Sequence, residues 1–109
     1  LLMIIWRQIN MYFVTCFQRY EPNDRIGVPD IGSARTVGYY EDKDIAIKAV
    51  KGNSCYMDER VYRYAVIENI PEGLYQLATE RIFFKWNEEQ EVFEMIDPLI
   101  DDWGNYAFG

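Results

Sequence analysis

The stretch Asp42-Lys-Asp-Ile-Ala-Ile-Lys-Ala-Val-Lys-Gly-Asn53 decides the fold, because its pattern is that of an amphipathic helix. Asp42 can cap a helix over residues 43–51, with acidic side chains in the first turn and lysines later, as the helix dipole favours. The apolar residues of this segment recur with the helical period and form one stripe: Ile45, Ala46, Ala49 and Val50. Gly52-Asn53 supplies the stop. The stretch predicts one principal helix that packs on a sheet.

The segments around this helix have the composition of β-strands. Residues 11–17 are rich in aromatic and β-branched side chains on both faces, which predicts a central strand covered on two sides. Further strands are predicted at residues 35–40, 62–70, 81–86 and 91–96, and the last two form a hairpin. Residues 74–77 are expected to continue in extended form, and residues 54–61 to form an irregular turn. The order β-β-α-β-β-β predicts an α+β fold: a mainly antiparallel sheet of about five strands with one principal helix packed on one face.

The chain of 109 residues has the usual size of one domain. Met11 opens a more regular segment than the residues before it. We therefore expect a single α+β domain at residues 11–109 and an N-terminal extension at residues 1–10. Residues 21–34 contain many turn formers and are a candidate recognition loop. A short helical turn that starts at Pro98 and runs through residues 101–103, and a final strand at residues 105–108, are expected at the end.

The composition excludes several classes of function. The sequence contains no histidine, which removes histidine-based acid–base catalysis, Ser-His and Cys-His nucleophile pairs and most zinc sites. Cys16 and Cys55 are too few for a disulfide framework and are interpreted as reduced, semi-buried thiols. The apolar run at residues 1–6 is far shorter than the about 20 residues of a membrane span and lacks the features of a secretory signal. We predict a cytoplasmic protein with no membrane association and no cofactor.

The acidic residues are the remaining candidates for catalytic groups. Asp58-Glu59, Glu68 and Glu80 could gather around a divalent cation, since hard oxygen ligands suit such ions. A metal-dependent hydrolase could use Glu68 and Glu80 together with Lys85. Carboxylates normally face water, so structural or solvated roles are favoured and no catalytic or metal residue is assigned.

Negative charge is concentrated at one end of the chain. Residues 1–85 carry eleven acidic and eleven basic side chains, so the net charge of −7 comes from residues 86–109, which have no Lys or Arg. Such a surface repels phosphate backbones and attracts basic protein surfaces. The predicted interaction face combines two tryptophans with the nearby carboxylates: Trp86, Glu88, Glu89, Glu91, Glu94, Asp101, Asp102 and Trp103. This pattern favours a non-catalytic interaction protein that does not bind nucleic acid directly. In its sharpest form, it inhibits a nucleic-acid-binding partner by phosphate mimicry.

An alternative function is the binding of a small anionic ligand. Arg35, Tyr39 and Tyr40 follow the loop of residues 21–34, and an arginine beside tyrosines can hold an anion by paired hydrogen bonds and stacking. A purely structural interpretation is also open, in which Arg35 forms an ion pair within the fold, with Glu59 or Glu68.

Several runs of sequence carry a resemblance to a bacterial protein group. These are Met-Tyr-Phe-Val-Thr-Cys-Phe at 11–17, residues 33–40, residues 53–59, Tyr64-Ala-Val-Ile-Glu68, Gly73-Leu74-Tyr75 and Phe83-Phe-Lys-Trp86. Together they resemble a group of small proteins from gut Clostridia and related Firmicutes, some of them on mobile elements. The resemblance covers residues 11–109, and residues 103–109 look like the closing segment of the group, which suggests a complete chain. It implies a recurring domain of bacterial or phage origin and no particular activity.

Overall fold

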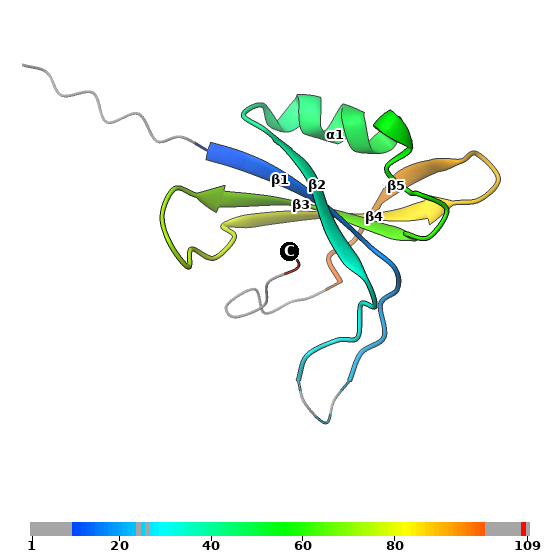
Figure 1. Ribbon diagram of the computed structural model, residues 1–109, viewed down its shortest axis with the longest axis horizontal. Helices are drawn as coiled ribbons and strands as arrows, with labels where there is room; N and C mark the ends of the chain where they lie inside the picture. Colours follow the sequence, from blue (N-terminus) through cyan, green and yellow to red (C-terminus); the bar gives the residue numbers. More distant parts are fainter. Residues whose placement is uncertain (1–9, 24, 26, 100–107, 109) are drawn as a thin grey trace, which may run out of the picture.

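Five strands form a single antiparallel sheet, as the sequence predicts (Figure 1). The computed structural model describes residues 10–23, 25, 27–99 and 108. The strands are β1 (Asn10–Phe17), β2 (Ala34–Tyr40), β3 (Tyr64–Pro71), β4 (Glu80–Asn87) and β5 (Val92–Ile96). Their order in the sheet is β2-β1-β3-β4-β5, so the apolar β1 has a neighbour on either side. The predicted α+β class, with one principal helix on one face, is confirmed.

Helix α1 (Lys43–Lys51) begins and ends where the sequence predicts. The Asp42 side chain accepts hydrogen bonds from the backbone N–H groups of residues 44 and 45, at 2.8 and 3.2 Å. Ala46, Ala49 and Val50 are buried, but Ile45 is 52% exposed. Successive helical residues are roughly 100° apart, which places Ile45 at the margin of the stripe centred on Ala46 and Val50.

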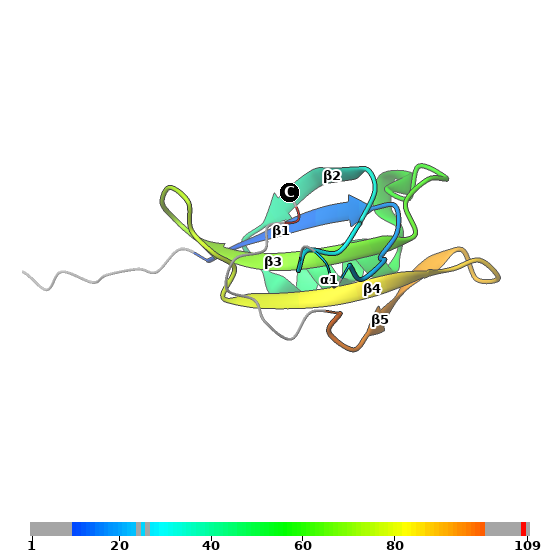
Figure 2. The ribbon, with the colours of Figure 1, turned by 90° about the horizontal axis from the view of Figure 1, so that it is seen from below.

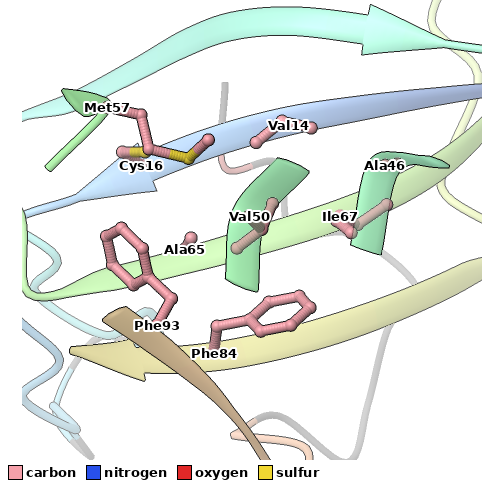
Figure 3. Packing of buried hydrophobic residues seen from close by; sticks show 9 residues of the cluster. All are labelled: Val14, Cys16, Ala46, Val50, Met57, Ala65, Ile67, Phe84 and Phe93. Atoms are coloured by element: carbon pink, nitrogen blue, oxygen red, sulfur yellow. The ribbon is translucent and has the colours of Figure 1, made fainter. Parts of the chain in front are cut away.

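Two layers of side chains cover the two faces of the sheet. On the helix side, a cluster of residues from α1 and four strands packs together, joined by Met57 (Figure 3): Val14, Cys16, Ala46, Val50, Met57, Ala65, Ile67, Phe84 and Phe93. Figure 2 shows the strands from the opposite side, with α1 behind them. On that side a smaller cluster contains Phe17, Val66, Phe83 and Phe108. No helix in the described part of the chain has the length and apolar character that a membrane span requires.

The connection between β3 and β4 differs from the prediction. Residues 74 and 75 form bends and residues 76 and 77 belong to no strand, and Tyr75 has a φ of 56° and is fully exposed. β3 ends at Pro71, which has no N–H to donate to a ladder. Gly73, with a φ of 136°, then turns the chain away from the sheet. The apolar residues of this loop therefore face solvent, and β4 begins at Glu80.

The remaining segments agree with expectation where they are described. Residues 54–61 form an irregular turn that includes the short 3₁₀ helix η1 (Ser54–Tyr56). In the loop predicted at residues 21–34, the described residues between β1 and β2, 21–23, 25 and 27–33, are irregular apart from one bridge between Glu21 and Asp30, and Ala34 already belongs to β2. The expected helical turn at 101–103 and the strand at 105–108 lie outside the described residues, except for Phe108.

Candidate functional site

The turn of the β4–β5 hairpin presents acidic side chains to solvent. The Asn87 side-chain oxygen accepts hydrogen bonds from the backbone N–H groups of Glu89 and Gln90, at 2.9 and 3.1 Å. The backbone N–H of Glu91 donates to the carbonyl of Asn87 at 2.8 Å, and Glu91 has a φ of 55°. These bonds fix a tight turn in which the side chains point outward. We call Glu88, Glu89, Glu91 and Glu94, all exposed, the acidic hairpin.

Neighbouring cations neutralise this surface only in part. Glu88 forms an exposed ion pair with Arg63, at 3.3 Å. Glu94 lies opposite Lys85 in the sheet register and accepts a hydrogen bond from the Asn87 side chain at 2.8 Å. Within the described residues, Glu89, Glu91 and Glu94 form no ion pair. Exposed pairs contribute little, so the hairpin remains negatively charged.

Trp86 is half-buried at the base of the acidic hairpin. Its ring meets Phe93 edge-on, with centroids 5.0 Å apart, and it packs against the helix-side cluster. The aromatic side chain is thus held rigidly by the core, while part of it reaches the surface. The other predicted members of the interaction face, Asp101, Asp102 and Trp103, lie outside the described residues.

A groove of about 720 Å³ lies between the acidic hairpin and the turn that follows α1. The residues that determine its charge and shape are Tyr56, Asp58, Glu59, Arg60, Trp86 and Glu91. Three acidic residues, one arginine and two aromatic residues therefore line the same groove. The sequence does not predict that Asp58 and Glu59 lie near the acidic hairpin, because they precede it by about thirty residues. Only the folded sheet brings the two segments together.

The turn of residues 53–60 is held in an unusual backbone conformation. Five of its residues have positive φ without being glycine: Asn53, Cys55, Tyr56, Glu59 and Arg60. The Asn53 side chain donates to the Asp58 carboxylate at 2.7 Å and accepts from the Asp58 backbone N–H at 3.1 Å. Asp58 is buried and also accepts from the backbone N–H of Arg60 at 3.2 Å. This network offsets the cost of the left-handed residues, roughly 1 kcal/mol each.

A second cavity, of about 410 Å³, lies between β2 and the same turn. Arg35 and Tyr40 both line it, whereas Tyr39 is on the other face of β2, against Phe13, with ring centroids 5.8 Å apart. Arg35 Nη1 lies 3.3 Å from Glu59 Oε2, so Arg35 forms one of the two ion pairs that the structural interpretation predicts. Both side chains are substantially exposed, so the pair does not close the cavity.

The carboxylates considered for metal-dependent hydrolysis lie in separate places. Glu68 accepts a hydrogen bond from Arg81 at 2.9 Å in a buried pair between β3 and β4. Glu80 pairs with Lys43, and this contact raises the pKa of Lys43. Burial raises the pKa of Glu68, and the Arg81 hydrogen bond opposes this shift without cancelling it. Among the described residues, no three acidic or thiol side chains have the arrangement of a metal site.

The two cysteines occupy different environments. Cys55 is exposed in η1, whereas Cys16 is fully buried in the helix-side cluster, and they form no disulfide. Burial raises the pKa of the Cys16 thiol to about 12, with smaller contributions from the Glu59 and Asp58 carboxylates. At neutral pH, Cys16 is therefore an unreactive thiol.

No protein-family model, no curated protein and no solved structure matches the chain. The functional assignment depends on the geometry and charge of the surface.

Proposed function

We propose that the protein is a non-catalytic interaction protein of the bacterial cytoplasm whose acidic hairpin docks on a basic protein surface. The observation that carries the proposal is the display of Glu89, Glu91 and Glu94, which have no ion-pair partner among the described residues. Glu91 lines the groove together with the half-buried Trp86, whereas Glu94 lies on the opposite face of the sheet. Its sharpest form is a phosphate mimic of bacterial or phage origin that occupies the nucleic-acid site of its partner. A resemblance to a group of small Clostridial proteins, some of them on mobile elements, would be compatible with that role.

The groove supplies a second reason for a cationic partner. Asp58, Glu59 and Glu91 line it together with Tyr56 and Trp86. An arginine or lysine of a partner can place its charge over an aromatic face while carboxylates accept its hydrogen bonds. Complementary charge also speeds association and makes binding sensitive to salt.

Two features weigh against catalysis at this surface. The sequence has no histidine to act as a general base near neutral pH. Glu68 and Glu80, the carboxylates of the hydrolase alternative, are in ion pairs with Arg81 and Lys43 and do not reach the groove.

The proposal is tested by neutralising Glu89, Glu91 and Glu94 together. Immobilised wild-type protein and the variant Glu89→Gln/Glu91→Gln/Glu94→Gln are each incubated with a lysate of the source bacterium, and captured proteins are identified by mass spectrometry. We expect the wild type to capture a basic, nucleic-acid-binding protein that added DNA displaces. The variant should lose that capture at least tenfold.

A matched control separates local charge from total charge. The variant Glu21→Gln/Glu41→Gln/Glu72→Gln removes three exposed carboxylates elsewhere, with the same change in net charge. It should retain capture. Equal capture by wild type and the hairpin variant, or equal loss in both variants, contradicts docking through the acidic hairpin.

A further inference from the structure

The cavity beside β2 has a basic group at one end. Arg35 is 64% exposed and uses one nitrogen, Nη1, to contact both oxygens of Glu59, each at 3.3 Å. Within the described residues, Nε and Nη2 of Arg35 donate no hydrogen bond. These two nitrogens form the planar edge of a guanidinium that binds a carboxylate by two parallel hydrogen bonds. An anion can therefore bind Arg35 without displacing Glu59.

The rest of the cavity offers space for an apolar body. The ring of Tyr40 and the side chains of Val14, Val37 and Met57 line it. A bulge in β2 leaves Val37 unpaired, because Val14 pairs with Gly38 and Thr15 with Thr36. A Cβ added at Gly38 would meet no atom within 4 Å, so the space next to this backbone is open. A volume of about 410 Å³ lies within the usual range of small-molecule sites.

The charge around the cavity limits the kind of anion. Glu59 lines it directly, and Asp58 is the next residue. A dianion such as a phosphate monoester would be repelled more strongly by these carboxylates than a single carboxylate would. We infer that this cavity binds a small aromatic monocarboxylate, with its carboxylate on the Nε–Nη2 edge of Arg35 and its ring between Val37 and Tyr40.

Cys55 provides a direct readout, because it is exposed and lines the cavity. Alkylation of Cys55 by iodoacetamide is followed by mass spectrometry at pH 8, with benzoate as the probe and chloride to hold ionic strength constant. The buried Cys16, with its pKa raised to about 12, should stay unmodified and report that the protein remains folded. We expect millimolar benzoate to slow Cys55 alkylation at least threefold in a saturable manner.

Two variants and two other probes make the result decisive. Arg35→Gln removes the charge, and Gly38→Val places a side chain in the open space, where an added Cβ meets no atom within 4 Å; both should abolish the protection. Benzamide, the neutral analogue of benzoate, should give none, and phenyl phosphate should give less. Thermal unfolding of each variant verifies that it is folded.

Several results would overturn the inference. They are no saturable protection by benzoate, equal protection by benzamide, protection that persists in both variants, or stronger protection by phenyl phosphate. The assay contains no partner protein, so its failure leaves docking through the acidic hairpin unaffected, although Tyr56 and Glu59 line both the cavity and the groove.

Discussion

The two faces of the sheet keep their polar groups in different places. On the helix side the centre is apolar, and polar side chains lie at the margin, in the turn of residues 53–60 and at Glu91 of the acidic hairpin. On the opposite side an ion pair, Glu68–Arg81, is buried at the centre, and the Phe108 ring centroid lies 5.6 Å from the Arg81 guanidinium carbon. Thr15 and Thr36 add a hydrogen bond of 2.9 Å on that side.

This difference separates binding from stability. Polar groups at the margin of the helix side border the groove and the cavity, where a partner or ligand can reach them. Glu68 and Arg81 are 3% and 4% exposed, so nothing outside the protein can reach them. Substitutions on the helix-side margin should therefore change binding with modest effects on folding, and substitutions at the buried pair should do the opposite.

The largest effect on stability is expected at the buried pair Glu68–Arg81. Glu68→Leu leaves the Arg81 guanidinium buried without this carboxylate, and we expect the free energy of unfolding to fall by about 3–5 kcal/mol. The double variant Glu68→Leu/Arg81→Met removes both charges and should recover most of that loss. Urea unfolding measures both values. A loss below about 1 kcal/mol in the single variant would show that the pair is not closed to water.

Local signals made the helix side predictable. Asp42, the later lysines and Gly52-Asn53 specify α1 within a dozen residues, and the structure has the helix there. The Glu68–Arg81 pair could not be foreseen in the same way, because it depends on the register between β3 and β4. The loop between β3 and β4 sets that register. Its apolar residues predict extended backbone from the sequence, but in the structure they face solvent.

The candidate sites were predictable only in part. The alternation of side chains along a strand already implies that Tyr39 and Tyr40 face opposite sides, so only one of them can share a cavity with Arg35. The run of acidic residues indicated the hairpin. No local sequence pattern predicts that Asp58 and Glu59 lie near the acidic hairpin. Their position depends on left-handed residues in a turn that contains no glycine.

The margin of the helix side is tested at Asn53. Asn53→Ala removes two side-chain hydrogen bonds to Asp58 and places alanine at a φ of 48°. We expect a loss of about 2 kcal/mol, from about 1 kcal/mol of hydrogen bonding and a similar cost for the left-handed backbone. Asn53→Gly removes only the hydrogen bonds and should lose about 1 kcal/mol. Chemical denaturation measures the difference, and equal losses would mean that the backbone conformation contributes nothing.

A smaller effect is expected at the start of α1. Asp42→Ala removes the side chain that accepts from two backbone N–H groups of the first turn, which should cost about 1 kcal/mol. Asp42→Ser keeps an acceptor and should lose less than half of that. Thermal unfolding of the two variants compares them. Equal destabilisation would show that the negative charge of Asp42, and not its hydrogen bonds, stabilises the helix.

The exposed pair Lys43–Glu80 gives the smallest effect and the sharpest contrast with Glu68–Arg81. Its side chains are 40% and 39% exposed, so solvent screens the attraction, and Lys43 lies in the first turn of α1, where the helix dipole disfavours a cation. Lys43→Ala alone should therefore be almost neutral. A double-mutant cycle with Glu80→Ala should give a coupling of about 0.5 kcal/mol that 1 M salt removes.

The pH dependence of this coupling has a definite sign. Glu80 raises the pKa of Lys43 in the folded protein above its unfolded value of 10.5. While the Glu80 carboxylate is ionised, the stabilisation is therefore complete below that pH and is lost as the pH rises through the raised pKa of Lys43. A coupling that persists in 1 M salt, or that exceeds about 2 kcal/mol, would contradict this expectation. Lys43–Glu80 would then be as strong as the buried pair, and burial would not explain the difference between them.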